Sequence, residues 1–193
     1  MDPLLSEMWL IDAPGTVEFF ATSLGDVIED QARDTRSLAV PRDEFLYVSG
    51  ALAEFALVAD HGAEHLPLAG TLRELHDLFV TDLSTWQDRE LMEAAGVQAL
   101  MLTGFFAGGM RQRHNLDTYV CWGRFFFDRA ASGTSGPKRA VLGGMSRHFP
   151  VWRHHLERLH VQLWEDSHLL ALEQPTVRFP AAVLGRPDAG RHH

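Results

Sequence analysis

Histidine and glutamate side chains recur at helical spacing in this 193-residue chain. In the run from Trp152 to His168, Glu157 stands three residues before His160, so both would lie on one face of a helix. A Glu-x-x-His pair on each of two helices, with one glutamate from each of two others, builds a di-iron site inside a helical bundle. The pattern raises the hypothesis of a metal-dependent bundle enzyme.

The second Glu-x-x-His pair, Glu165 and His168, follows eight residues later on the same expected helix. Eight residues turn a helix by about 80° net, so the two pairs do not face one point. The remaining ligands must come from elsewhere, and the nearest set lies in segment 54–65. The competing hypothesis, which we favour, is that these histidines are polar residues on helix faces. The metal candidates are Glu54, His61, His65, Glu157 and His160.

Other chemistry has weaker support. The arginine-rich run from Arg147 to Arg158 carries guanidinium groups that suit phosphate or carboxylate, but the acidic residues among and after them favour an ordinary charged helix face. The candidate base for Cys121 is His114, seven positions earlier, and we favour a buried structural thiol over a nucleophile. No glycine-rich phosphate-binding motif is present, so nothing supports nucleotide binding.

Helices must position these residues, because apolar residues recur at helical spacing and no convincing period-two alternation occurs. We predict an all-α, single-domain antiparallel bundle of six or seven helices over residues 1–173, and an irregular or disordered tail over 174–193. Capping boxes, prolines and glycines set the expected boundaries, including a break at Pro150. The predicted helices cover residues 16–32, 41–59, 71–83, 86–102, 116–131, 137–148 and 151–172.

Composition and charge narrow the class of protein. The 46% hydrophobic and 22% charged residues are typical of a globular domain. The net charge of −9 argues against a nucleic-acid partner, since such proteins present a basic face to phosphates. No run reaches the roughly 18 apolar residues of a membrane span, and the start of the chain lacks the basic region of a signal peptide. We therefore expect a cytoplasmic protein.

Surplus aromatic residues predict an interface. Three consecutive phenylalanines at 125–127 point around most of a helix, so one of them would meet solvent unless a partner covered it. Two more lie within a glycine-rich turn at 104–109. We expect self-association, as a homodimer, through some of these residues. The interface candidates are Phe105, Phe106, Phe125, Phe126 and Phe127.

One stretch resembles a pattern found in uncharacterised helical bacterial proteins. From Arg89, the pattern leads to Gly96, a small polar residue, a leucine-rich run and then Thr103-Gly-Phe. Its continuation, roughly Tyr-Tyr-x-x-x-Gly-Arg, is matched by residues 118–124, with a threonine in place of the first tyrosine. The resemblance implies helical structure and a bacterial source, and it implies no activity.

No motif in the chain names a reaction. The expected function is a non-catalytic helical interaction or regulatory module, homo-oligomeric, with self-association or another protein as its partner and no predicted cofactor. The alternatives are a metal-dependent bundle enzyme of the di-iron or a similar His/carboxylate type, and a bundle that binds a small apolar ligand between its helices.

Overall fold

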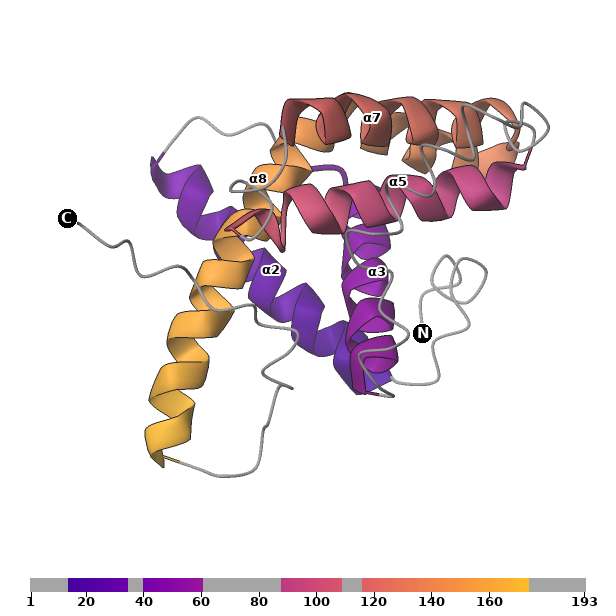
Figure 1. Cartoon of the computed structure of the whole chain (residues 1–193). Helices are drawn as coiled ribbons and strands as arrows, with labels where there is room; N and C mark the ends of the chain where they lie inside the picture. Colours follow the sequence, from indigo (N-terminus) through magenta and orange to yellow (C-terminus); the bar gives the residue numbers. More distant parts are fainter. Residues whose placement is uncertain (1–13, 35–39, 61–87, 109–115, 174–193) are drawn as a thin grey trace.

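A computed structural model describes residues 14–34, 40–60, 88–108 and 116–173. Within these ranges the chain is helical and has no strand, which confirms the all-α prediction. None of the described helices is long and apolar enough to cross a membrane. The predicted helix at 71–83 and the predicted tail at 174–193 lie outside the described residues. The described helices are α2 (Pro14–Asp34), α3 (Arg42–Asp60), α5 (Arg89–Thr103), α7 (Leu116–Ser132) and α8 (Gly136–Glu173) (Figure 1).

Helix α8 is the element around which the others are arranged, because it contacts each of the other four described helices. Its side chains Phe149 and Trp152 are completely buried. They share one core with Tyr47 of α3 and Phe127 of α7, which are also completely buried. Helix α2 closes the core from another side with Phe20, Leu24 and Val27, buried at the helical spacing of three and four residues.

Helix α5 begins at Arg89, three residues later than the sequence predicted. Asp88 is its N-cap, and the Asp88 carboxylate accepts hydrogen bonds from the backbone N–H groups of Glu90 (3.0 Å) and Leu91 (3.1 Å). These bonds satisfy two of the four N–H groups that a helix start leaves without partners. At the other end the N–H of Gly104 bonds to the carbonyl of Leu100 (2.8 Å).

Helices α7 and α8 form a hairpin, and α7 runs beside the first part of α8 (Figure 1). The reversal ends at Gly136, whose φ of +68° lies in the left-handed region that glycine adopts without steric cost. Close approach of the two helices depends on Gly123, because a Cβ there would overlap the ring of Phe149. The glycine in α7 thus makes room for an aromatic side chain of α8.

The predicted helix break at Pro150 was wrong: α8 continues from Gly136 to Glu173 with Pro150 inside it. Proline has no N–H for the carbonyl four residues earlier, which here belongs to Ser146. The Arg124 side chain supplies the missing donor, since its Nε donates to the Ser146 carbonyl at 3.2 Å. The Ser146 hydroxyl in turn donates to the Arg124 carbonyl at 2.8 Å. Helix α8 bends along its length (Figure 1), as expected for a helix with an internal proline.

Candidate functional site

The most concentrated polar chemistry in the described residues surrounds the buried carboxylate of Glu44, near the start of α3. Glu44 is 4% exposed. Its two oxygens each lie 3.0 Å from Nδ1 of His148 on α8. The indole N–H of Trp152, one turn further along α8, donates to Glu44 Oε2 at 2.8 Å. The buried carboxylate therefore has two donors, as a buried charge requires.

The carboxylate fits against α8 because Gly144 has no side chain. A Cβ at Gly144 would overlap the Glu44 carboxylate, so any larger residue would displace it. Gly144, His148 and Trp152 follow one another at four-residue intervals and therefore lie on one face of α8. That face thus offers the Glu44 carboxylate two nitrogen donors and the space that Gly144 leaves.

This arrangement fixes the orientation of the His148 ring. An ionised carboxylate only accepts hydrogen bonds, so Nδ1 of His148 is the donor in this contact and the ring is held with Nδ1 toward Glu44. A histidine held in this way can serve as a base or as a metal ligand. Within the described part of the chain, however, no group of three or more His, Cys, Asp or Glu side chains could hold a metal ion.

A second polar cluster joins α3, α5 and α8. The hydroxyl of Tyr47 donates to Glu93 Oε1 at 3.1 Å, and Lys138 Nζ lies 2.8 Å from Glu93 Oε2. Burial raises the pKa of Tyr47 well above its ordinary value, and the Glu93 carboxylate raises it further. Partial burial raises the pKa of Glu54, with repulsion from Glu93 as the second cause. The Glu93 carboxylate thus bridges one buried and one half-exposed donor.

His155 makes no hydrogen bond to either cluster. It is 1% exposed, and neither of its ring nitrogens has a hydrogen-bond partner among the described residues. Its ring packs edge-on against Trp152, with centroids 5.8 Å apart. Burial lowers the pKa of His155 to about 4, and the neighbouring His154 contributes to the decrease. The side chain is therefore neutral near pH 7.

The proposed metal ligands are only partly within the described residues. Glu54 lies on α3, and Glu157 and His160 lie on α8. The His160 ring packs edge-on against Phe105, with centroids 5.0 Å apart. Repulsion from the Glu93 carboxylate helps to raise the pKa of Glu54, after its partial burial. His61 and His65 lie outside the described residues, so the metal site as a whole stays a prediction.

The five phenylalanines proposed as interface residues differ in burial. Phe105, Phe126 and Phe127 belong to the core of the single chain, at 4%, 4% and 0% exposure. Phe106 is half-buried and packs edge-on against Phe105. Phe125 is 37% exposed. Only Phe125 and Phe106 thus have surface to offer a partner.

The glycine-rich turn after α5 is a packing feature. A Cβ on Gly104 would lie 2.9 Å from Cβ of Leu156 and 3.0 Å from the Arg153 carbonyl. The Nε of Arg153 donates to the carbonyl of Thr103 at 3.1 Å, and this carbonyl is one that the helix end leaves without a partner. Thr103 and Gly104 therefore let the end of α5 rest directly on α8.

The expectation of a buried thiol at Cys121 was wrong, because Cys121 is exposed. Sequence reasoning did not single out Glu44, His148 and Trp152 as a site. A signal was present in α8: a glycine inside a helix followed by polar side chains four and eight residues later. The Glu44 carboxylate on α3 lies about a hundred residues earlier in the chain, and no neighbouring residues mark it as the partner of this helix face.

No known protein family model, curated protein or solved structure matches this chain.

Proposed function

We propose that this protein is a non-catalytic helical interaction module, a bundle of six or seven helices that pairs with a second copy through the outer face of α7. The observation that carries the proposal is Phe125, which is 37% exposed in the middle of that helix. The opposite side of α7 is buried in the core through Phe126, Phe127 and Ala130. An exposed aromatic side chain on a helix whose opposite side is packed in the core is typical of a protein–protein interface.

Neighbouring side chains extend this surface. Cys121 is exposed one turn before Phe125. Tyr119 and Trp122 are half-buried and pack edge-on with centroids 5.7 Å apart, and aromatic residues are enriched at protein interfaces. In a symmetric pair the same face of both copies would meet, so α7 would pack against α7. We place the protein in the bacterial cytoplasm, where an exposed free thiol stays reduced.

In this proposal the Glu44 cluster holds α3 against α8 and performs no chemical step. The support is that both donors to the carboxylate come from one helix and the carboxylate comes from another. Such contacts fix the relative position of two helices.

The test is the mass of wild-type protein and of Phe125→Glu by light scattering over a range of concentrations. We expect wild-type protein to dimerise and the variant to remain monomeric, because a carboxylate would be buried without a partner. Phe19→Glu is the matched control, since Phe19 is 40% exposed on α2. It should dimerise normally.

Cys121 provides an independent readout. Its reaction with a thiol reagent should slow as protein concentration rises, and Phe125→Glu should abolish this protection. A wild-type protein that is monomeric at every concentration, or equal disruption by both glutamate substitutions, would contradict the proposal.

A further inference from the structure

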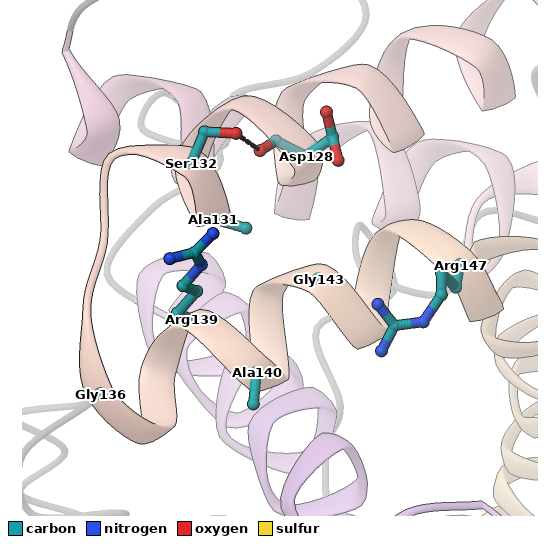
Figure 2. Close-up of a pocket in the computed structure, with 8 residues that line it drawn as sticks. All are labelled: Asp128, Ala131, Ser132, Gly136, Arg139, Ala140, Gly143 and Arg147. Carbon is teal, nitrogen blue, oxygen red and sulfur yellow. Dashed lines mark hydrogen bonds between the residues drawn. The ribbon is translucent and has the colours of Figure 1, made fainter.

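A hollow of about 430 Å³ lies between the end of α7 and the first turns of α8 (Figure 2). Its volume is within the range of small-molecule sites. Small residues create the space, because Ala131 on α7 and Ala140 and Gly143 on α8 line it. The hollow is open to solvent and lies on the α8 face that the Glu44 cluster does not use.

Two arginines of α8 line this hollow. Figure 2 shows Arg139 reaching from α8 to Ala131 at the end of α7, and Arg147 extending back toward Gly143. The Arg147 Nη1 atom lies 3.4 Å from the position that a Cβ on Gly143 would occupy. The two residues are eight apart, which places their Cα atoms about 12 Å apart along the helix. The Arg139 guanidinium group thus lies near Ala131, and that of Arg147 lies near Gly143 (Figure 2).

Neither arginine has a hydrogen-bond or ion-pair partner within the described residues. Other cations nearby are engaged: Lys138 pairs with Glu93, and Arg124 bonds to the Ser146 carbonyl. Two guanidinium groups without a partner among the described residues are notable in a chain of net charge −9. The planar guanidinium group suits bidentate contact with phosphate or carboxylate oxygens.

The remaining polar groups set limits on the ligand. Asp128 lines the hollow from α7 and would repel an anion placed beside it. The Ser132 hydroxyl donates to the Asp128 carbonyl at 2.9 Å. The first turn of α8, at Gly136, adds the positive end of the helix dipole. A ligand with anionic groups at its two ends, and a hydroxyl or amine that Asp128 can accept from, matches this arrangement.

We infer that the hollow between α7 and α8 binds a small molecule with two anionic groups, phosphate or carboxylate, one held by Arg139 and the other by Arg147. This site goes beyond the proposed self-association, and anion binding needs no dimer.

The test is calorimetric titration of the full chain with tripolyphosphate and, separately, with citrate at constant ionic strength. We expect binding of at least one probe, and the tighter probe identifies the anion. Arg139→Gln and Arg147→Gln should each weaken that binding by about tenfold, because each removes one anion contact. Asp128→Asn should strengthen it, because the substitution removes a like charge.

Arg158→Gln is the matched control, since Arg158 is exposed on the same helix and does not line the hollow. It should change affinity less than twofold, and circular dichroism should show every variant folded. The inference is overturned if neither probe binds, or if Arg158→Gln weakens binding as much as Arg139→Gln and Arg147→Gln do.

Discussion

At the scale of single residues, two adjacent glycines of α8 have opposite surroundings. A Cβ on Gly144 would overlap the Glu44 carboxylate, whereas a Cβ on Gly143 would meet only Arg147 Nη1, at 3.4 Å. Alanine favours a helix over glycine by up to about 1 kcal/mol at either position. At Gly144 this gain is outweighed, because the carboxylate must leave both Trp152 and His148.

We therefore expect the two alanine substitutions to change stability in opposite directions. Gly144→Ala should lower the free energy of unfolding by about 1–3 kcal/mol, the usual cost of overpacking a buried site. Gly143→Ala should leave it unchanged or raise it by up to about 1 kcal/mol. Urea denaturation followed by circular dichroism measures both. Equal effects would show that Glu44 is not confined by α8 as described.

At the scale of elements, two arginines satisfy carbonyl groups that helices leave without partners. Arg153 of α8 bonds to the carbonyl of Thr103 at the end of α5. Arg124 of α7 bonds to the carbonyl of Ser146, which Pro150 cannot serve. Each bond joins two helices, so a carbonyl group without a partner in its own helix is satisfied by a side chain of another helix. The Arg124 bond is exposed and the Arg153 bond is partly buried, so each should contribute about 0.5–1.5 kcal/mol, the net value of an ordinary intramolecular hydrogen bond.

This reasoning predicts an energetic coupling between Arg124 and Pro150. Arg124→Met should destabilise the wild-type protein by about 0.5–1.5 kcal/mol, because the Ser146 carbonyl loses its donor. In a Pro150→Ala background residue 150 regains an N–H, so the same substitution should cost less. A double-mutant cycle by urea denaturation gives the coupling energy, expected at about 0.5–1.5 kcal/mol.

Arg139→Met is the control for loss of a guanidinium group from the same hairpin, and its cost should not depend on residue 150. If the effects of Arg124→Met and Pro150→Ala are simply additive, the Arg124 side chain does not stand in for the proline.

At the scale of the whole molecule, sequence patterns predicted most helix positions, because apolar stripes and caps are local properties. Helices α2, α3 and α7 begin and end within two residues of the expected positions. The break predicted at Pro150 failed because the compensating donor comes from Arg124 on another helix. The Glu44 site escaped prediction for the same reason, since its donors lie on a helix far along the chain.

Residues 89–124 contain several of the positions where helices approach one another closely. Gly96 lies against the ring of Phe127, with 3.0 Å from the position of a Cβ to the nearest ring atom. Gly104 and Gly123 are close-approach positions against α8, and Thr103 and Arg124 bond to α8. The glycines and polar residues of this segment therefore serve the packing of α5, α7 and α8.

His155 links the stability of the whole molecule to pH. Burial holds its pKa at about 4 in the folded protein, below the ordinary value of 6.5 that the unfolded chain would show. Between these values the unfolded chain binds the proton and the folded protein does not, so stability falls as pH decreases. The contribution is fully present above about pH 6.5 and is lost as the pH falls toward 4. Its size is about 3 kcal/mol, since one pKa unit corresponds to 1.36 kcal/mol.

We expect the free energy of unfolding of wild-type protein to fall more steeply between pH 7.5 and 4.5 than that of His155→Leu, by about 2.5 kcal/mol over this interval. Urea denaturation at several pH values measures the difference. Leu156→Ala is the control, because it removes a completely buried neighbour and destabilises the protein without removing a titrating group. Its pH dependence should follow the wild type. The alternative outcome is that the free energy of unfolding of His155→Leu depends on pH as steeply as that of the wild type. In that case the His155 imidazole gains a proton as readily in the folded state as in the unfolded chain, and its burial does not control acid stability.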